Sequence, residues 1–509
     1  MYKIFEDVEY KTLKEGKSFV IKGIEYDSRK IEKDFVFVAM TGSAVDGHDF
    51  IQKAIDGGAK MIISEKNIDT GQYQSASDVT FIQVEGIRKK LGIIASNYYG
   101  YPQDKIKIIG ITGTNGKTTS SFILENILEK TARIGTTGNR ILDKEFETVN
   151  TTPESLELIK LIDKSVKSGA DYFIMEVSSH ALEIGRVDML KFDSAIFTNL
   201  TQDHLDFHKT MENYFNAKKK IFSMLRNNKN HTGSGVINID DEYGAKIYLE
   251  NNAKNFISIS VKNEDADIWG DILNYTNNGM KVKINLKNYL EKYGKNLKNT
   301  ENVYRFEIDL VGEYNLYNIL GCIASALSLG IEMDFIVKKL ETMPAVPGRF
   351  ETIKNDLDVR IVVDFAHTDD GLLNVGKTLK QITDNRVITI FGAGGDRDHE
   401  KRPKMAQAAI KFSDFIILTS DNPRTENPTK ILADIEKGLI GEKFPFNRYL
   451  IIADRERAIK YGTQMLEKGD SLLIAGKGHE TYQIIGTEKI HFDDREIVKE
   501  ALETKIQRG

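Results

Sequence analysis

The chain has a single cysteine among its 509 residues, Cys322, in the apolar stretch NILGCIASALSLG. One cysteine cannot form a disulfide within its own chain, so the sequence excludes a disulfide-stabilised scaffold. A thiol in such a stretch behaves as a small hydrophobic side chain. We therefore expect Cys322 to be buried and without a chemical role.

The sequence also has no apolar run that approaches the ~20 residues of a membrane helix. The first residues, MYKIFEDVEY, lack the basic segment and apolar core of a signal peptide. Positive charge is not in excess, since 75 Asp and Glu residues outnumber 70 Lys and Arg residues. We predict a cytoplasmic protein that binds neither membranes nor nucleic acid.

The length of the chain predicts about three domains, because domains average ~100–200 residues. Segments 99–105 (YGYPQDK) and 343–351 (MPAVPGRFE) combine Pro and Gly without periodicity and are candidate boundaries. Apolar strand-like runs alternate with polar and helical segments, which is typical of parallel sheets covered by helices. Residues 252–312 differ, since alternating runs such as MKVKINL predict an antiparallel excursion.

The segment GITGTNGKTT (110–119) is the strongest local signal for a binding site. It follows an apolar strand and opens an amphipathic helix, where glycine-rich backbone offers N–H donors and the positive end of the helix dipole to an anion. Lys117 can reach terminal phosphates, and the Thr118 hydroxyl can bind Mg²⁺. The spacing departs from the general phosphate-binding loop because Gly113 stands between Gly110 and Gly116.

Three further segments of the central region carry groups suited to a metal site, and each also has a purely structural interpretation. Glu176 ends the apolar run YFIM and suits Mg²⁺, yet charged strand ends are common. Asp203 and His204 can face a metal, or Asp203 can cap a helix. Lys218 lies in NAKKK, which taken alone is typical of a solvated helix face.

Five other residues are candidates for contacts with a nucleotide. Asn315 and Asn318 share a helix face at i, i+3, where their amides can hold a base or be exposed to solvent. The segment PGRF contributes Arg349, and DFAH contributes Asp364 and His367. Each of these signals is weak by itself.

The last third of the chain has four apolar strands that each end in a polar loop. The segments are RIVVDFAHTDD, VITIFGAGGDRDHEKRP, FIILTSDNPRTENP and SLLIAGKGHETYQ. Ligands of open α/β sheets bind outside the carboxyl ends of the strands, so these loops predict one site. Arg397, Arg402 and Arg424 suit a carboxylate, and Glu480 suits an ammonium group. Together they predict a small zwitterionic ligand.

Ten segments in one order resemble the Mur ligase family, the ATP-dependent amino-acid ligases of peptidoglycan synthesis. The segments span almost the whole chain: GITGTNGKTT, NTTPES, MEVSSHALEIGRV, TNLTQDHLDFH, the AK of NAKKK, PGRFE, DFAHT, GGDRDHEKRP, DNPRTENP and GKGHETYQ. The tetrapeptide DNPR resembles the diaminopimelate-adding branch, because the lysine-adding branch lacks this arginine. In departure from many relatives, Ile184 stands where Gln is usual and Asp369 where Pro is usual.

The resemblance implies a three-domain α/β fold. Its parts are an N-terminal UDP-muramoyl-binding α/β domain (1–103), a central P-loop parallel-sheet ATPase domain (104–345) and a C-terminal Rossmann-like, amino-acid-binding domain (346–509). It also implies ATP, Mg²⁺ and a carbamate on Lys218, which replaces the solvated-face interpretation of that lysine. The implied substrates are UDP-MurNAc-L-Ala-D-Glu and a diamino acid, handled by a monomer.

The resemblance assigns a role to each candidate residue. Catalysis falls to Lys117, Glu176, His204 and Lys218, and metal binding to Thr118, Glu176, His204 and Lys218. ATP contacts fall to Gly113, Thr114, Asn115, Gly116, Lys117, Thr118, Thr119, Asn318, Arg349, Asp364 and His367. UDP-muramoyl dipeptide contacts fall to Ser28, Asn150, Thr151, Thr152, Ser178 and Arg186. Amino-acid contacts fall to Arg397, Asp421, Asn422, Pro423, Arg424, Gly476 and Glu480.

The implied reaction joins the D-glutamate γ-carboxylate to an amine of diaminopimelate through an acyl phosphate. A close isostere such as meso-lanthionine fits the same pattern. An L-lysine-adding ligase and a folylpolyglutamate synthetase are alternatives, although DNPR and the N-terminal YDSRK argue against the second. A non-catalytic nucleotide-binding regulator and a nucleic-acid-driven ATPase are alternatives from other classes.

Overall fold

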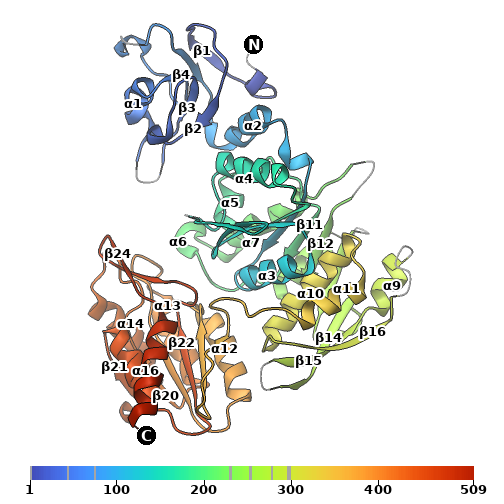
Figure 1. The fold of residues 1–509 in the computed structure, drawn as a ribbon, viewed down its shortest axis with the longest axis vertical. Coiled ribbons are helices and arrows are strands. Elements are labelled where there is room, and N and C mark those ends of the chain that lie inside the picture. The colour runs from blue at the N-terminus through green and yellow to red at the C-terminus, as the bar shows by residue number, and fades with distance from the viewer. Residues whose placement is uncertain are drawn as a thin grey trace. The chain divides into compact units, whose positions relative to one another are not determined.

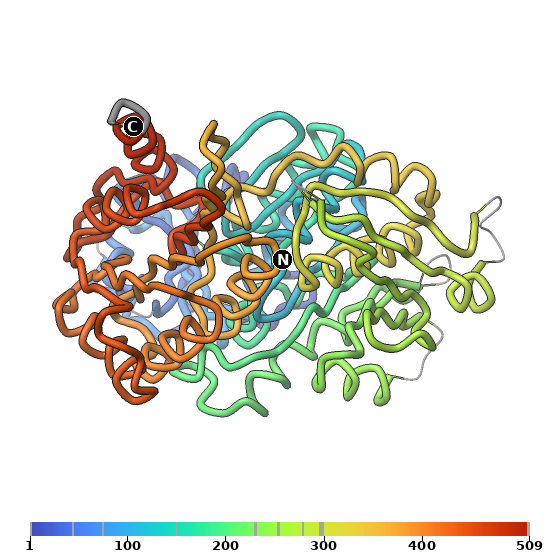
Figure 2. The backbone as a smooth tube through the Cα atoms, turned by 90° about the horizontal axis from the view of Figure 1, so that it is seen from below, coloured from blue at the N-terminus to red at the C-terminus, as the bar shows by residue number. Residues whose placement is uncertain are grey.

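The computed structural model describes residues 3–42, 45–73, 76–148, 150–228, 232–251, 255–276, 279–294 and 300–508 (Figure 2). The chain divides into two compact units. The first unit comprises Met1–Thr112, Leu128–Ala195 and Ala217–Gly233, and the second comprises Gly113–Ile127, Ile196–Asn216 and Ser234–Gly509. The bounds of the three predicted domains stay predictions.

The first unit begins with a five-stranded sheet. Its strands are β1 (Lys11–Lys14), β2 (Gly23–Glu25), β3 (Phe35–Ala39), β4 (Ala59–Ser64) and β5 (Thr80–Gln83). They lie in the order β1-β5-β4-β3-β2, parallel except for β1. Helix α1 (Ile51–Asp56) packs Ala54 against Phe37 and Ile62 of the sheet, and α2 (Ile87–Tyr99) follows β5. The apolar runs FVFVAM and KMIIS therefore supply strands β3 and β4.

The rest of the first unit contains a second group of strands. They are β6 (Lys107–Thr112), β7 (Thr131–Gly135), β8 (Gly138–Ile141), β9 (Lys144–Phe146) and β10 (Tyr172–Glu176). Strands β6, β10 and β7 are neighbours in that order and run parallel. In the chain, α4 (Ser155–Lys167) precedes β10 and α5 (Ser179–Glu183) follows it. Strands β8 and β9 are antiparallel, which the sequence analysis did not predict. Two-residue connections such as 136–137 can join only antiparallel strands.

The second unit contains the helix of the phosphate-loop segment and an extended group of strands. The helices are α3 (Lys117–Ile127), α6 (Leu205–His208), α8 (Glu242–Glu250), α9 (Lys287–Tyr293), α10 (Glu313–Ser328) and α11 (Met333–Glu341). The strands are β12 (Ser234–Asn238), β13 (Phe256–Ser260), β14 (Ile268–Tyr275), β15 (Met280–Asn285) and β16 (Val303–Ile308). Antiparallel pairing of β14, β15 and β16 confirms the excursion predicted for the described part of 252–312. Strand β11 (Ser194–Phe197) and helix α7 (Met211–Ser223) each include residues of both units.

The C-terminal part of the second unit is a six-stranded sheet. It comprises β17 (Glu351–Thr352), β18 (Arg360–Asp364), β19 (Val387–Phe391), β20 (Phe415–Leu418), β21 (Tyr449–Ile451) and β22 (Ser471–Ala475). The order is β17-β18-β22-β19-β20-β21, and only β17 is antiparallel. Figure 1 shows this sheet in the orange and red C-terminal part of the chain. Strands β18, β22, β19 and β20 are thus consecutive neighbours. The four polar loops meet at one edge, as predicted.

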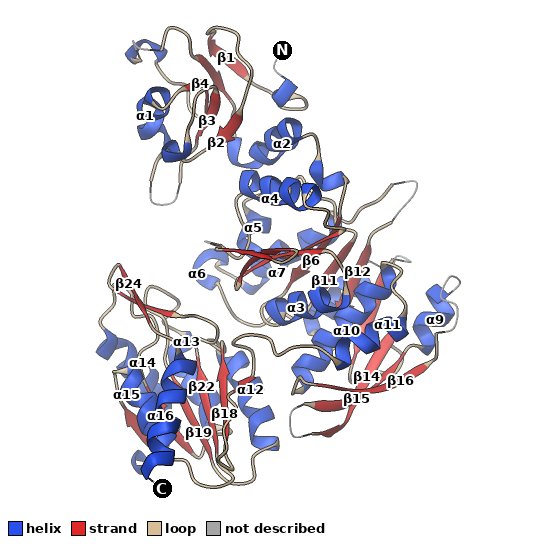
Figure 3. Cartoon of the chain, in the orientation of Figure 1, coloured by secondary structure: helices blue, strands red, loops and turns tan. Residues whose placement is uncertain are grey.

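Helices cover both faces of this C-terminal sheet (Figure 3). One face packs against α12 (Asp369–Gln381), α13 (Lys401–Ile410) and α14 (Pro428–Gly441), and the other against α15 (Arg455–Gln464) and α16 (Asp494–Arg508). Strand β18 shows why, since Val362 faces the first group and Ile361 and Val363 the second. A separate hairpin, β23 (Tyr482–Ile485) and β24 (Glu488–His491), completes the region.

Cys322 lies within α10 and is fully buried. Burial raises the pKa of its thiol, which keeps the side chain neutral. The prediction of a buried hydrophobic role is confirmed. Among the described helices, none is long and apolar enough to cross a membrane.

Candidate functional site

The phosphate-loop segment has backbone geometry that only glycine accommodates at two positions. Gly113 has φ +152° and Gly116 has φ +88°, both in the region that disfavours other residues. A Cβ at position 113 would collide with Oγ1 of Thr198, and one at position 116 with Oδ1 of Asn318. Because α3 begins directly afterwards at Lys117, its N-terminal N–H groups fit an anion such as a phosphate.

The side chains of this loop hold it in shape. Lys117 Nζ donates to the carbonyl oxygens of Gly113 at 2.9 Å and Thr114 at 2.8 Å, so its charge lies at the loop itself. The Thr118 hydroxyl accepts a hydrogen bond from Nη2 of Arg349 at 3.1 Å. The phosphate loop and PGRF, which are 231 positions apart at this contact, are therefore brought together.

Asn315 and Asn318 are both buried in α10, so the interpretation that these amides are exposed is wrong. Asn318 Nδ2 donates to Asn315 Oδ1 at 3.2 Å, and the Ser120 hydroxyl reaches Asn318 Oδ1 at 3.4 Å. The carboxamide of Asn318 thus stands beside the glycine loop at Gly116. This position fits its predicted contact with ATP.

Asp364, at the end of β18, has both carboxylate oxygens engaged by backbone. They accept from the N–H groups of Phe350 at 2.6 Å and Ala366 at 2.7 Å. Burial raises the pKa of this carboxyl. Asp364 therefore connects the segment PGRF, through Phe350, to its own segment DFAH. A second contact joins the same segments, since the guanidinium carbon of Arg349 lies 4.7 Å from the ring centre of Phe365.

His367 follows the same strand and stays neutral at pH 7. Burial, and then the positive charge of Lys401, lower its pKa to about 4. In the unfolded chain a histidine has a pKa of ~6.5. Between pH ~4 and ~6.5 the unfolded chain therefore binds more protons than the folded chain. Stability is therefore expected to fall as pH falls from about 6.5 to 4, and less steeply in His367→Gln. Thermal unfolding across this range measures the difference.

The exposed His491 supplies a control for that measurement. Its pKa is raised by Glu496, so its contribution has the opposite sign. That contribution is complete below pH ~6.5 and is lost only above it, so His491→Gln is expected to leave the fall in unfolding temperature between pH 6.5 and 4 unchanged. Parallel curves for the wild type and His367→Gln would contradict the assignment of a depressed pKa to His367.

Glu176 is fully buried at the end of β10, inside the first unit. Its Oε1 accepts from the N–H of Thr136 at 3.0 Å, and its Oε2 from the Thr136 hydroxyl at 3.1 Å. Thr136 lies forty positions away in the unpredicted β7–β8 turn, so no local pattern in the sequence indicated this contact. The carboxylate oxygens of Glu176 suit Mg²⁺, and its metal role stays a prediction.

Several residues predicted to hold the muramoyl dipeptide lie together beside Glu176. The Thr152 hydroxyl donates to the Glu176 carbonyl oxygen at 2.9 Å and lies 3.2 Å from the Ser178 hydroxyl. Nη1 of Arg186 donates to the Thr152 carbonyl at 2.9 Å. The Thr151 hydroxyl is 3.1 Å from that of Thr136. Four of the six predicted residues therefore form one cluster.

The other two predicted residues are less connected. Ser28 begins a short 3₁₀ helix, Ser28–Lys30, and Asn150 is exposed. Glu154, which lies in the quoted segment NTTPES but received no role, accepts from Arg186 at 3.0 Å and from Arg88 at 2.8 Å. Its buried Oε2 has no hydrogen-bond partner among the described residues. The spacing of this glutamate, two positions after Thr152, was the signal that could have identified it.

Lys218 is only 1% exposed in α7, so the solvated-face interpretation is wrong for it. Lys220, two positions later, is exposed and forms an ion pair with Glu183, so it does lie on a solvated face. The carbamate itself stays a prediction.

His204 has φ +54° and precedes α6, and the Asp203 carboxylate accepts its N–H at 2.9 Å. Burial alone would raise the pKa of Asp203, but His204 and Lys401 lower it to about 2. Among the described residues, no three His, Cys, Asp or Glu side chains form a metal-binding group. The predicted metal ligands Thr118, Glu176, His204 and Lys218 offer hard oxygen donors at two positions, and their metal roles stay predictions.

The two departures from the family pattern have simple structural settings. Ile184 ends α5 with φ −92°. Asp369 opens α12, where a negative charge complements the helix dipole. Its neighbour Asp370 accepts from Nδ2 of Asn115 at 2.9 Å, another partner that the sequence analysis missed.

The loops after β20 and β22 hold most of the predicted amino-acid contacts. Asn422 Nδ2 donates to Glu480 Oε2 at 2.9 Å, and the fully buried Lys477 donates to the same oxygen at 3.0 Å. Gly476 has φ +115°, and a Cβ there would collide with Oδ2 of Asp421. The structure therefore brings these predicted residues together.

The arginines of this edge have different roles. Arg424 Nη1 donates to the Gly395 carbonyl at 2.7 Å, and Arg397, which is exposed, follows in the same neighbouring loop. Arg402 is fully buried and binds Glu426 at 2.8 Å and Asp434 at 3.1 Å. Arg402 thus supports the loops, whereas Arg397 and Arg424 remain available to a carboxylate.

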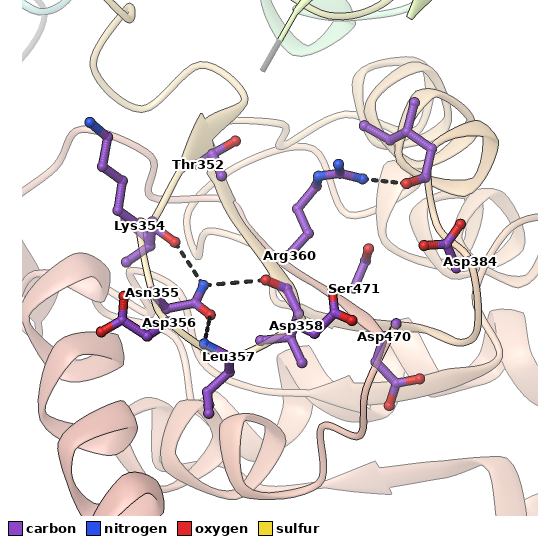
Figure 4. A pocket seen from close by; sticks show the side chains of 14 residues that line it. Thr352, Lys354, Asn355, Asp356, Leu357, Asp358, Arg360, Asp384, Asp470 and Ser471 are labelled. Carbon is purple, nitrogen blue, oxygen red and sulfur yellow. Dashed lines mark hydrogen bonds between the residues drawn. The ribbon is translucent and has the colours of Figure 1, made fainter. Parts of the chain in front are cut away.

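A pocket of about 610 Å³ lies elsewhere on the C-terminal sheet. It includes Arg360 and Ser471, the first residues of β18 and β22, so it lies at the amino ends of the strands. Figure 4 shows Asn355 bonded within its own loop, to the carbonyls of Ile353 at 3.1 Å and Val359 at 3.3 Å. Ligands of such sheets bind at the opposite, carboxyl ends. This pocket is not the candidate site.

Comparison with known proteins identifies the fold and the site together. The description "Mur ligase family, catalytic domain" matches residues 20–99, "Mur ligase middle domain" matches 111–326, and "Mur ligase, glutamate ligase domain" matches 348–478. The UDP-N-acetylmuramoyl-L-alanyl-D-glutamate--2,6-diaminopimelate ligase of Fusobacterium nucleatum is 49% identical over 500 residues, which cover 97% of each chain. The chain belongs to the Mur ligase family.

Other relatives agree. A Clostridium perfringens protein of the same name is 44% identical over 511 residues, 99% of each chain. A solved structure bearing this name is 33% identical with a TM-score of 0.64, covering 96% of this Mur ligase and 95% of that chain. A Mycobacterium tuberculosis folylpolyglutamate synthase is 16% identical with a TM-score of 0.59, which shows the fold alone. The predicted three-domain α/β fold and the ATP-dependent, amide-forming activity are confirmed.

Proposed function

We propose that this Mur ligase adds meso-2,6-diaminopimelate, or a close isostere such as meso-lanthionine, to the D-glutamate γ-carboxylate of UDP-MurNAc-L-Ala-D-Glu, with cleavage of ATP to ADP and phosphate. The observation that carries the proposal is the loop Asp421–Arg424. It lies at the carboxyl edge of the C-terminal sheet and joins Asn422 to Glu480 while Arg424 meets the neighbouring glycine loop. The names of relatives that share almost the whole chain support the same substrates.

The first chemical step activates a carboxylate, because a carboxylate does not react with an amine at neutral pH. The γ-carboxylate attacks the γ-phosphorus of ATP, forming an acyl phosphate and releasing ADP. Two anions must meet, so positive charge at the phosphate loop, supplied by Lys117, offsets their repulsion. Mg²⁺, when bound by oxygen donors such as Thr118 and Glu176, supplies further positive charge to the phosphoryl oxygens.

The second step forms the amide bond. The free amine of the diamino acid attacks the acyl carbon, phosphate leaves, and the amine loses a proton. We assign Glu480, which Lys477 and Asn422 hold, to the substrate's ammonium group. We assign Arg424 and Arg397 to its distal carboxylate, which lysine lacks. No side-chain nucleophile takes part in this sequence.

The remaining roles extend the family pattern residue by residue. Glu176 and Lys218, both buried, act at the metal, with Lys218 as a carbamate that provides anionic oxygens. His204 also acts at the metal. The cluster of Thr151, Thr152, Ser178 and Arg186 binds the muramoyl dipeptide, assisted by Ser28 and Asn150. The enzyme works as a cytoplasmic monomer.

A phosphate-release assay tests the proposal. We expect release from ATP in the presence of UDP-MurNAc-L-Ala-D-Glu to depend on diaminopimelate and to be weak with lysine. Competition between diaminopimelate and lanthionine then ranks the two isosteres, whose difference in a pocket is worth only ~1–3 kcal/mol. Release that ignores the amino acid, or that prefers lysine or a folate substrate, would rule the proposal out.

A further inference from the structure

In the hairpin β23–β24, residues 482–491, strand β23 and the turn after it are bound to the loop Asp421–Arg424. Gln483 Nε2 donates to the Asp421 carbonyl at 2.7 Å, and the Ile484 N–H donates to Asn422 Oδ1 at 2.9 Å. The Arg424 N–H donates to the Ile484 carbonyl at 3.1 Å. The Gly486 N–H donates to the Arg424 carbonyl at 2.8 Å. Four hydrogen bonds therefore connect two segments that lie about sixty positions apart in the chain.

These bonds explain an unusual backbone conformation at Arg424. Its φ is +52°, in the left-handed region that a side chain with a Cβ rarely adopts. Both polar backbone groups of Arg424 are held by the hairpin, in a bridge to Ile485. The hairpin thus holds this arginine in a conformation that it would not adopt in a free loop.

The conformation determines where the guanidinium lies. Nη1 donates to the Gly395 carbonyl, and no other described residue forms a hydrogen bond with the guanidinium. Arg424 lies in a partly buried space, where burial and then the positive charge of Arg397 lower the pKa of its guanidinium. Donors that protein groups leave unused in such a space suit a bidentate carboxylate.

Gln483 is the residue of the hairpin most suited to this positioning role. Its side chain is 7% exposed, and its amide reaches back to the first residue of the loop. On the same hairpin, the Tyr482 hydroxyl lies 3.4 Å from Glu480 Oε1, so the hairpin also meets the ammonium-binding end of the site. It contacts the groups proposed for both ends of the amino acid.

We propose that the β23–β24 hairpin is a specificity-determining element of the amino-acid site, and that Gln483 is its principal positioning residue. The hairpin holds Arg424 so that its guanidinium binds the carboxylate that distinguishes a diamino diacid from lysine. This inference rests on the proposed function, since it concerns the same substrate. It assigns selectivity to the hairpin in addition to Glu480 and the loop Asp421–Arg424.

The test replaces Gln483 by Met, which keeps an unbranched side chain of similar length but removes the amide donor. We expect the KM for diaminopimelate to rise about tenfold, while the KM values for ATP and the muramoyl dipeptide stay within twofold. The kcat/KM for lysine is expected to stay within twofold, so the preference for diaminopimelate falls. Gly486→Ala, whose new Cβ would meet open space but whose φ of +62° would be strained, is expected to shift selectivity in the same direction.

Controls separate positioning from stability. Thr487→Met adds the same side chain at an exposed position of the same hairpin and is expected to leave all constants unchanged. Thermal unfolding checks that each variant folds. Equal losses for diaminopimelate, lysine and ATP in Gln483→Met, or an unchanged KM for diaminopimelate, would overturn the inference. A wild-type enzyme that does not use diaminopimelate would instead overturn the proposed function.

Discussion

Arg424→Ala is expected to lower kcat/KM for diaminopimelate by about 100-fold or more and to leave ATP binding unchanged. A charge-assisted hydrogen bond contributes ~1.5–3 kcal/mol, and a bidentate pair lies at the upper end of that range. Truncation also leaves the substrate carboxylate desolvated and unpaired. The guanidinium contacts the Gly395 carbonyl and not the phosphate loop, so we expect Arg424→Ala to keep the wild-type affinity for ATP.

Steady-state kinetics and nucleotide titration measure the two effects separately. Arg424→Lys keeps the charge but loses the forked donor, so an intermediate loss is expected. Arg457→Ala removes an exposed arginine from α15 in the same domain and serves as the matched control. Equal damage to diaminopimelate addition and to ATP binding by Arg424→Ala would refute the assignment of this residue to the carboxylate.

Lys117→Met is expected to lower the rate of ADP formation by about 10³-fold. Removing one group that stabilises developing charge in a transition state costs ~10²–10³ in rate, and here the lost group is a full positive charge at the phosphates. The loss should lie in kcat, because phosphoryl transfer requires this charge more than binding does. Rapid-quench measurement of ADP, with both other substrates saturating, reports it directly.

A structural role of Lys117 has to be separated from this chemical role, since its Nζ also holds the carbonyls of Gly113 and Thr114. Nucleotide affinity and thermal unfolding therefore accompany the kinetics. Lys411→Met, at an exposed position after α13, is the matched control and should behave as wild type. Normal ADP formation by Lys117→Met would contradict the role of this lysine in phosphoryl transfer.

Much of the candidate site was predictable because its signals are local. The strand, glycine loop and helix around Lys117 are adjacent in sequence, and the two positive φ values agree with glycine at positions 113 and 116. The four strand-end loops were predicted to meet because parallel strands present their carboxyl ends at one edge. The structure makes β18, β22, β19 and β20 neighbours, which that argument requires.

Other features could not be predicted, because they depend on pairs of residues that are far apart in the chain. The pairing of Gln483 with Asp421 and that of Arg88 with Glu154 are examples. The fully buried ion pair of Arg455 and Asp494, at 2.7 Å, is another. The burial of Lys218 was invisible in the run NAKKK, since three consecutive lysines carry no signal that one of them turns inward.

The sequence by itself determined the α/β class, the phosphate loop and the set of residues able to bind a zwitterion, since each depends on neighbouring residues and the period of a strand or helix. Only the tertiary structure decided how those residues are held. Asp364 uses both oxygens to anchor backbone, and a hairpin holds the left-handed Arg424. The physical reason is that a polar group forms hydrogen bonds with any partner that the fold brings within reach, and residues from any part of the chain can bury a side chain.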